Sequence, residues 1–255
     1  MTIDQAIEVF VEGYGFVRSF SHPYVPERIH SGIWLLRDAE RKRGDYRSEE
    51  YVAYGVDPAE VLRTACAHTR GRYKMSVIRA ADEPDVEIRA GFKALGCRLN
   101  TTEGFFLHPL TNLAPVDCPA EIVRVTTLEQ ADLLTTATLR RHILPRHLAA
   151  DPPPLRQYMA LIDSRPVGWV GSVPVCGAAW CTSMYVQPLH RRKGIARALM
   201  MRMLADDRDS GASASVLLAS HTGAKLYPVL GYERIGELMM YSPPKGRTAG
   251  MEFPR

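Results

Sequence analysis

The stretch Tyr185-Val-Gln-Pro-Leu-His-Arg-Arg-Lys-Gly-Ile-Ala-Arg-Ala-Leu-Met200 joins a strand pattern to an amphipathic helix through a short basic loop. From Gly194 onward, Ile195, Leu199 and Met203 recur every four residues, which predicts a helix with a wide apolar face that ends near residue 208. A helix N-terminus exposes unpaired backbone N–H groups and carries a partial positive charge, and both favour a bound anion. The stretch therefore predicts an anion site where this helix begins.

The basic loop itself strengthens that prediction. Arg191, Arg192 and Lys193 would lie at the positive end of the helix dipole, where each exposed cation is unfavourable by roughly 0.3–1 kcal/mol. A purely structural helix start would favour Asp, Ser or Glu. A pyrophosphate would neutralise the cluster, and the small residues Gly194 and Ala196 would let its oxygens reach the backbone. The alternative is a solvated surface loop, which is how most basic triplets are used.

The elements around this stretch follow a regular order. Between the expected strand at 121–127 and the expected strand at 233–241 we expect two helices, three strands joined as antiparallel hairpins, the long helix, a buried strand and a short helix. Their ranges are 127 onward, 140–149, 156–163, 167–175, 179–186, 194–208, 213–220 and 222–230. This order predicts a mixed α/β fold built on one twisted sheet flanked by helices.

The first half of the chain repeats part of this pattern. Residues 91–109 align with residues 226–244 at an offset of 135, which places Phe92 on Tyr227 and Gly96 on Gly231. Upstream, residues 72–80 correspond to the buried strand and residues 58–68 to the helix before it. We interpret this as a tandem duplication whose first copy has degenerated, although helix–Gly–strand junctions are common enough to match by chance. The proline-rich stretch 108–119 then separates a domain at 1–115 from a domain at 116–245, with a tail at 246–255.

Composition narrows the classes of protein. The chain is 46% hydrophobic and 24% charged, which is ordinary for a globular protein, and no apolar run reaches the ~20 residues of a membrane span. Residues 116–255 carry 17 basic and 12 acidic residues, an excess that suits a small anion and is too scattered for nucleic acid. The five cysteines lack CxxC spacing, so we expect buried or partly buried free thiols, no metal site and a cytoplasmic location.

Three segments, in order, resemble one known family. The loop RRKGIA (191–196) resembles the (Q/R)xxGx(G/A) pyrophosphate loop of the GNAT superfamily of N-acetyltransferases. The segment CTSMYVQPLH (181–190) resembles the splayed strand before that loop, and ASHTGAKLYPVLGYERIG (219–236) resembles the second signature of the family. The resemblance covers about residues 120–242 and implies a GNAT fold there. It does not extend over residues 1–115, where Arg41-Lys42-Arg43-Gly44 is basic but precedes no apolar helix.

The resemblance also implies residue roles. A bound acetyl-CoA would contact the splayed strand, the loop and the end of the buried strand. These residues are Met184, Tyr185, Val186, Arg191, Arg192, Lys193, Gly194, Ile195, Ala196, Arg197 and Ser220. Ser220 stands where the family often has Asn. The strand at 180–186 contains no carboxylate, although many members place their general base there.

Two catalytic residues are expected. Tyr227 matches the residue that protonates the CoA thiolate in many family members, and its alternative role is packing on a short helix. His221, just past the buried strand, is our first candidate for the general base, because an imidazole pKa near 6.5 suits that role. A solvent-exposed loop histidine is an equal alternative for His221. His142, His147 and a chain of water molecules also remain open.

Together these features imply an acetyl-CoA-dependent N-acetyltransferase that acts by direct attack of an amine on the thioester. The alternative is a non-catalytic acyl-CoA-binding or sensing module of the same fold. The acceptor is a small-molecule or protein amine, and we expect no nucleic acid or membrane partner. The chain would be a monomer with paired halves or a homodimer, in which the first half does not bind cofactor.

Overall fold

The computed structural model describes residues 1–244, so the expected tail at 246–255 lies outside it. Spatial clustering divides the chain into two compact units, each made of three segments. The first unit contains Met1–Gly13, Leu107–Leu217 and Lys225–Glu233; the second contains Tyr14–Phe106, Leu218–Ala224 and the residues from Arg234. The expected boundary between residues 115 and 116 falls inside the long segment of the first unit, and as a domain boundary it remains a prediction.

The first unit is built on the strand order β10-β9-β8-β7-β6. Neighbouring strands are antiparallel except β9 and β10, which are parallel. The bounds are β6 (Glu121–Arg124), β7 (Arg156–Ile162), β8 (Arg165–Val175), β9 (Ala178–Val186) and β10 (Ser215–Ser220). The two predicted hairpins are confirmed, because β7, β8 and β9 pair in sequence through short turns.

Helices α4 (Leu128–Thr138), α5 (Pro145–Leu148) and α6 (Ile195–Asp209) complete this unit together with the first part of α1 (Ile3–Arg18). The predicted capped start of α4 is confirmed. The Thr127 hydroxyl accepts from the Gln130 N–H, and the Gln130 side chain accepts in turn from the Thr127 N–H, both at 3.3 Å. This reciprocal cap satisfies donors that a helix start leaves unpaired.

Two predicted helices are shorter than expected. The helix at 140–149 reduces to α5, because Leu139 adopts a left-handed conformation (φ 56°) and the next turn starts only at Pro145. The helix at 222–230 is instead two 3-10 turns, η2 (Gly223–Lys225) and η3 (Pro228–Leu230). Pro145 and Pro228 each occupy the first position of a helical turn. Proline has no N–H to donate to the preceding turn, so a helix that started earlier could not continue through either residue.

Helix α6 is fixed on the sheet by a buried polar cluster as well as by its apolar face. The Arg156 guanidinium donates to Asp207 Oδ1 at 2.7 Å, and the Ser172 hydroxyl donates to the same oxygen at 2.6 Å. Both charged groups are buried. Breaking such a pair is costly because it leaves a buried charge without its partner, so the cluster holds α6 in one position on strands β7 and β8.

The start of helix α1 packs on strand β9. The Phe10 ring lies 5.2 Å from the Trp180 ring, centroid to centroid. At Gly13 the approach is closer still, because a Cβ built there would lie 2.3 Å from Trp180 Cβ. Real Cβ contacts do not occur at that distance, so only glycine allows this helix to lie on β9.

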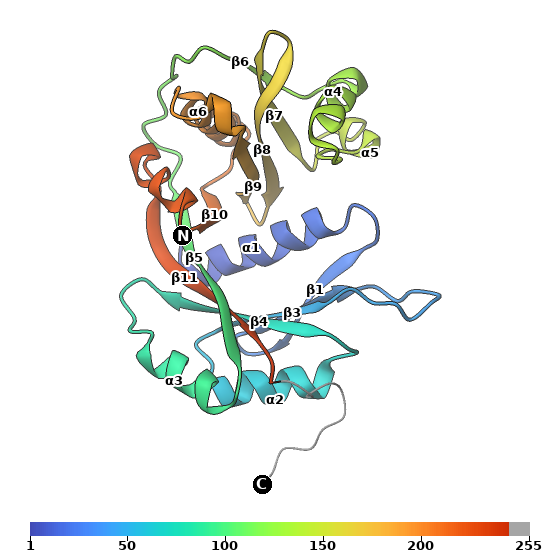
Figure 1. Cartoon of the computed structure of the whole chain (residues 1–255), viewed down its shortest axis with the longest axis vertical. Helices are drawn as coiled ribbons and strands as arrows, with labels where there is room; N and C mark the ends of the chain where they lie inside the picture. Colours follow the sequence, from blue (N-terminus) through green and yellow to red (C-terminus); the bar gives the residue numbers. More distant parts are fainter. Residues whose placement is uncertain (245–255) are drawn as a thin grey trace. The chain divides into compact units, whose positions relative to one another are not determined.

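The second unit has the strand order β1-β2-β3-β4-β11-β5. Helices α2 (Pro58–His68) and α3 (Val86–Ala94) lie side by side on one face of its sheet (Figure 1). The strands are β1 (Tyr24–His30), β2 (Ile33–Asp38), β3 (Glu49–Tyr54), β4 (Tyr73–Ala80), β5 (Arg98–His108) and β11 (Glu233–Ser242). The predicted helix at 58–68 is confirmed, and the predicted strand at 72–80 begins one residue later.

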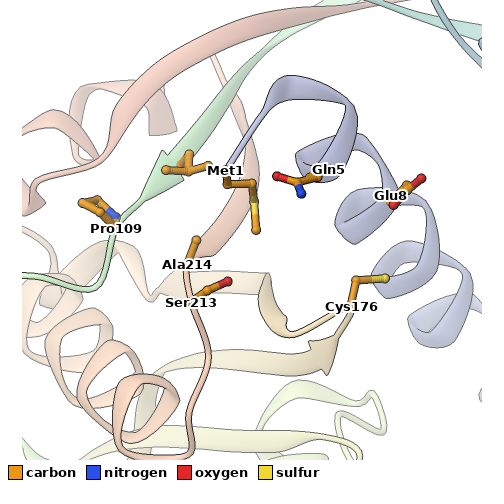
Figure 2. A pocket seen from close by; sticks show the side chains of 8 residues that line it. Met1, Gln5, Glu8, Pro109, Cys176, Ser213 and Ala214 are labelled. Atoms are coloured by element: carbon orange, nitrogen blue, oxygen red, sulfur yellow. The ribbon is translucent and has the colours of Figure 1, made fainter.

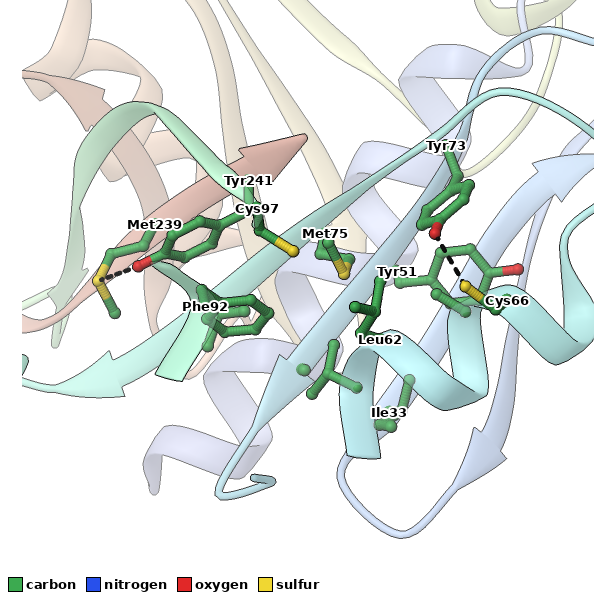
Figure 3. Packing of buried hydrophobic residues seen from close by; sticks show 14 of the residues in the cluster. Ile33, Tyr51, Leu62, Cys66, Tyr73, Met75, Phe92, Cys97, Met239 and Tyr241 are labelled. Atoms are coloured by element: carbon green, nitrogen blue, oxygen red, sulfur yellow. Dashed lines mark hydrogen bonds between the residues drawn. The ribbon is translucent and has the colours of Figure 1, made fainter. Parts of the chain in front are cut away.

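The core of this unit lies between the sheet and those two helices. Figure 3 shows Leu62 and Phe92 among the buried residues of this cluster, with Tyr51 and Tyr241. The Phe92 ring stacks on the Tyr241 ring with centroids 4.2 Å apart. Tyr241 comes from β11, whose residues Gly236–Tyr241 pair antiparallel with β4. The last strand of the chain therefore completes a core formed otherwise by the first hundred or so residues.

The two halves of the chain share an element order. The order α1-β1-β2-β3-α2-β4-α3-β5 parallels α4-β7-β8-β9-α6-β10-η3-β11, and β6, α5 and two short 3-10 turns have no counterpart among the described residues. The parallel pair β3/β4 corresponds to β9/β10. Gly96 (φ 75°) and Gly231 (φ 89°) both end their helical turn in the left-handed conformation, and the following strands begin at the same offset of 135. These correspondences support a duplication.

All five cysteines are free thiols, and three of them are buried. Cys118 is partly buried, whereas Cys176 is exposed at the β8–β9 turn, which corrects the expectation that all five would be at least partly buried. Among residues 1–244, no helix combines the length and the apolar character that crossing a bilayer requires.

Candidate functional site

Helix α6 begins without a side-chain cap. Gly194 occupies the N-cap position in the left-handed conformation (φ 80°), and no acidic residue lies in the first turn. Arg191, Arg192 and Lys193 are exposed just before it, and Arg197 is exposed in the first turn. Unpaired N–H groups, the helix dipole and these cations all favour an anion at this end of α6.

The requirement for glycine at residue 194 is conformational. A Cβ there would lie 3.5 Å from the Asp117 carbonyl oxygen and 3.7 Å from Cys118 Cβ, which are ordinary contacts. The positive φ, in contrast, is strained for any residue with a Cβ. Arg192, two residues earlier, is also left-handed (φ 64°), so the chain turns sharply into the helix at this loop.

Strand β9 leaves its parallel neighbour before it reaches the loop. The register of β9 with β10 covers only Ala179↔Ser215 and Trp180↔Val216, although β9 continues to Val186. Beyond Trp180, the backbone N–H and C=O groups on the β10-facing edge of β9 do not pair with β10. The strand therefore has the splayed form that the resemblance implied.

A bulge accompanies this divergence. Between the pairs Trp169↔Tyr185 and Gly171↔Thr182, strand β9 has one residue more than β8. In the bulge, Ser183 and Met184 of β9 lie opposite the single residue Val170 of β8. Ser183 is left-handed (φ 57°). Bulges redirect side chains and are frequent next to functional sites, so this one changes which way the end of β9 presents its backbone.

The end of β9 is also held by a stack of side chains that sequence reasoning missed. The Tyr185 ring, 39% exposed, stacks on the Trp169 ring with centroids 4.8 Å apart. The Arg191 guanidinium lies over the Tyr185 ring, with its Cζ 5.5 Å from the ring centroid. Its Nε donates to the Val186 carbonyl at 2.9 Å. A hairpin without a bulge around Cys176-Gly177 would pair Trp169 with Met184, and the bulge shifts its partner to Tyr185, so no spacing in the sequence indicated this stack.

Tyr227 is a buried phenol. It directly precedes η3, is 6% exposed, and packs edge-to-face against the Tyr232 ring at 5.5 Å. Burial raises the pKa of Tyr227 well above its ordinary value, and the nearby Cys181 thiol adds to this. The phenol therefore keeps its proton at neutral pH, as an unperturbed tyrosine also would, and its predicted donor role stays a prediction.

Ser220 and His221 belong to the short stretch 218–224, which clusters with the second unit. Both are exposed, and the Ser220 hydroxyl accepts from the Gly223 N–H at 3.3 Å. Their spatial relation to Tyr227 and to the loop at 191–197, which belong to the first unit, stays a prediction.

The other two histidine candidates differ in their surroundings. The His142 ring lies 5.4 Å from Trp169, and its Nε2 is buried without a hydrogen-bond partner among the described residues. Burial lowers the pKa of His142 to about 4, helped by Arg140, so the ring is neutral at neutral pH. Burial also lowers the pKa of His147. His142 joins the aromatic stack through its contact with Trp169.

A separate cavity of about 420 Å³ opens elsewhere on the first unit. Figure 2 shows Gln5 and Glu8 of helix α1 on one side, and Ser213 and Cys176 on another. Cys176 belongs to the turn before β9, whereas the basic loop follows the end of β9. Among the described residues, none of the predicted cofactor contacts lines this cavity.

The described residues of the second unit lack the features of this site. Strands β3 and β4 remain paired over six residue pairs, from Glu49↔Tyr73 to Tyr54↔Ile78, so no splayed edge forms. At the start of α2 the Asp57 carboxylate accepts from the Ala59 N–H at 2.8 Å, which places a negative charge where an anion would bind. Phe92 replaces the tyrosine.

Residues 41–44, which the sequence already excluded as a pyrophosphate loop, also do not occupy the position equivalent to the basic loop. Residues 41–44 lie between β2 and β3, whereas the connection equivalent to 187–194 is the one between β3 and α2. That connection contains Gly55, Asp57 and Pro58 and no basic residue.

Comparison with known proteins identifies a family for one part of the chain. Residues 154–234 match the family model of the acetyltransferase (GNAT) domain. No curated protein matches the chain. Among solved structures, the chain is similar to a GCN5-related N-acetyltransferase from Kribbella flavida, with a TM-score of 0.65 and 17% identity, over 96% of this chain and 97% of that one.

Two further structures are similar over most of the chain. A GCN5-related N-acetyltransferase from Sphaerobacter thermophilus has a TM-score of 0.54 and 14% identity, over 95% of this chain and 92% of that one. A tandem GNAT protein from the clavulanic acid biosynthesis pathway has a TM-score of 0.53 and 14% identity, with 94% of each chain covered. At such identities these likenesses show a shared fold.

Proposed function

Residues 154–234 belong to a GNAT acetyltransferase domain, and from this premise we propose that the chain transfers the acetyl group of acetyl-CoA to an amine. The observation that carries the proposal is the start of α6. Its N-cap residue, Gly194, has no side chain to satisfy the first N–H groups of the helix, and three cations precede it. A pyrophosphate supplies the acceptors and the negative charge that this helix start lacks.

The surroundings fit the rest of the cofactor. The pyrophosphate would lie on the N–H groups of Gly194–Arg197, with Arg192 and Lys193 supplying charge. The free edge of β9 near Met184–Val186 would hydrogen-bond the pantetheine arm, because that edge has left β10 after Trp180. Both features occur on consecutive elements of one unit, so a single extended ligand can use both.

The chemistry then needs a proton donor and a proton acceptor. The amine nitrogen attacks the thioester carbon, the C–S bond breaks, and the departing thiolate takes a proton from the Tyr227 phenol. Backbone N–H groups at the bulge of β9 stabilise the oxygen of the tetrahedral intermediate. The donor role is supported by the place of Tyr227 in the segment that resembles the second signature of the family; burial raises the pKa of its phenol and so makes it a weaker acid than a free tyrosine.

The proton of the attacking amine also needs an acceptor. β9 carries no carboxylate, and His221 is the first candidate base, with water as the alternative. His142 would be a weak base because of its lowered pKa, although it would accept a hydrogen bond readily. The acceptor is a small-molecule or protein amine, met in the cytoplasm, with no nucleic acid involved. The active form would be a monomer with paired halves or a homodimer.

A second candidate function is non-catalytic binding of acyl-CoA. The absence of a carboxylate on β9 favours it, because a sensing module needs the loop and the splayed strand but no base. Tyr227 counts against it, since a buried phenol beside the ligand is not needed for binding alone.

One experiment separates these functions. The protein is incubated with acetyl-CoA and a panel of amines, and free thiol is measured over time against a control without amine. Amine-dependent thiol release supports the transferase. Binding of acetyl-CoA without any turnover across the panel supports the sensing module, and no binding at millimolar acetyl-CoA contradicts both.

A further inference from the structure

We propose that Arg191 is a positioning residue that ties the free edge of β9 to the pyrophosphate loop, and that its side chain does not itself bind phosphate. This inference rests on the proposed function, because it concerns the same acetyl-CoA site. It differs from the role expected from the loop pattern, in which Arg191 is one of the cofactor contacts.

The first argument is the occupation of the Arg191 guanidinium. Its Nε donates to the Val186 carbonyl at 2.9 Å, and its Cζ lies 5.5 Å from the centroid of the Tyr185 ring. Arg191 has an extended backbone and follows the 3-10 turn η1 (Pro188–His190), which returns the side chain over the strand that it has just left. The side chain is thus directed back to β9.

The second argument is the direction of the carbonyl that Arg191 holds. The Gln187 N–H donates to the Val167 carbonyl at 2.8 Å, so the peptide group of Gln187 uses its N–H toward β8. In an extended strand the C=O of that same peptide group, which belongs to Val186, points the opposite way. It therefore lies on the edge that has parted from β10, which is the edge proposed for pantetheine.

The third argument is the anchoring of Tyr185. Its ring contacts both the Arg191 guanidinium and the Trp169 ring, which lies 4.8 Å away and almost parallel to it. The array continues to His142. A guanidinium suits this role because it is planar and is able to stack on a ring and donate from its edge at once, which an ammonium group cannot do. Arg191 consequently fixes the spacing between the strand edge and the helix start.

The test compares two ligands that share one part. Coenzyme A contains pantetheine and pyrophosphate, whereas free pantetheine lacks the phosphates. Titration calorimetry with each ligand is performed on the unchanged protein and on Arg191→Ala, Arg191→Lys and Arg192→Ala. A positioning role predicts that Arg191→Ala weakens both ligands by the same factor, about tenfold for the loss of one hydrogen bond from a charged donor. Arg191→Lys should not rescue either ligand.

Arg192→Ala is the matched control. Arg192 is adjacent, exposed and equally charged, and it should weaken coenzyme A while leaving pantetheine unchanged. The inference is overturned if Arg191→Ala weakens coenzyme A alone, if Arg191→Lys restores it, or if Arg191→Ala tightens pantetheine by freeing the Val186 carbonyl. Unchanged binding of both ligands in Arg191→Ala overturns it as well.

A measurement without ligand separates this inference from the proposed function. Backbone hydrogen exchange across residues 183–194 should be faster in Arg191→Ala and Arg191→Lys than in the unchanged protein, and unaltered in Arg192→Ala. Equal exchange in all four proteins contradicts the positioning role even where coenzyme A binds. Faster exchange combined with no binding of coenzyme A contradicts the proposed function and leaves the link between Arg191 and β9 established.

Discussion

Gly13 of helix α1 and Trp180 of strand β9 approach so closely that a Cβ on Gly13 would lie 2.3 Å from Trp180 Cβ. Both residues belong to the first unit, which therefore includes the start of the chain as well as the acetyltransferase segment. The helix covers the strand immediately before the point where β9 separates from β10, so its fit bears on the geometry of the site.

The first prediction concerns Gly13→Ala. In an exposed helix this change stabilises by up to ~1 kcal/mol, but here the new methyl group overlaps Trp180 and should destabilise by about 1–3 kcal/mol. Urea unfolding followed by circular dichroism measures the difference. Gly71→Ala is the control, because a Cβ there would have no heavy atom within 4 Å. A Gly13→Ala protein as stable as the unchanged one would contradict the packing of α1 on β9.

The second prediction concerns the fragment 116–255. It lacks Met1–Gly13, which cover Trp180, and all strands of the second unit except β11. We expect it to be aggregated or unfolded by gel filtration and circular dichroism, since it exposes apolar surface and an unpaired strand. A soluble and fully active fragment would show that the first half of the chain is dispensable.

The third prediction compares two glycines at opposite ends of α6. Gly194 (φ 80°) and Gly211 (φ 86°) are both left-handed, and a Cβ on either has room. Each Gly→Ala change should destabilise by roughly 1–2 kcal/mol through backbone strain. Only Gly194→Ala should also lose affinity for acetyl-CoA, measured by calorimetry. Equal affinity in both variants would place the pyrophosphate elsewhere.

The fourth prediction concerns the Tyr227 hydroxyl. Tyr227→Phe keeps the buried ring and removes the proton donor, so turnover should fall on the order of a hundredfold while acetyl-CoA affinity is retained. Tyr232→Phe is the matched control: its hydroxyl lies 2.9 Å from the buried Ser215 hydroxyl, and its loss should lower stability with little effect on turnover. If turnover is unchanged in Tyr227→Phe, Tyr227 is a packing residue.

The fifth prediction is a pH dependence of stability. The pKa of His142 is about 4 in the folded chain and is ordinarily 6.5, so between these values the unfolded chain binds the proton more readily. Stability present above pH 6.5 is therefore lost as the pH falls toward 4, by on the order of 1–2 kcal/mol because the ring is partly solvated.

His142→Phe should remove this part of the acid sensitivity while retaining the contact with Trp169. Thermal melts of both proteins between pH 4 and 7 measure the difference, and His30→Gln, a change at an exposed ring, serves as the control. Parallel curves for the unchanged protein and His142→Phe would show that His142 does not contribute.

The fold was largely predictable because its signals are local. Periodicity placed α6, the β7–β9 hairpins and α2 within a few residues, and the Thr127–Gln130 pair identified a capped helix. The errors lie at 140–149 and 222–230, where apolar spacing favoured helices. The left-handed Leu139 and the late start at Pro145 shorten the first, Pro228 interrupts the second, and a left-handed leucine gives no sequence signal.

The candidate site was predictable where a single element carries it. Gly194 and the cations are contiguous, so their placement followed from one helix start. The stack of Trp169, Tyr185 and Arg191 depends on the register across a hairpin and on the return of a side chain over its own strand. Those depend on three-dimensional geometry, which composition and spacing do not encode.

Strand β11 has a consequence for the order of events during synthesis. Its residues 236–241 pair with β4, and Lys74 reaches Met240 from 166 positions away in the chain. On a ribosome, the helices and strands of the first hundred residues emerge long before this partner exists. The edge of β4 that pairs with β11 therefore stays unpaired, and able to pair with other chains, until nearly the whole protein has been translated. A ribosome that stalls before residue 234 would release a chain whose earliest sheet lacks an inner strand.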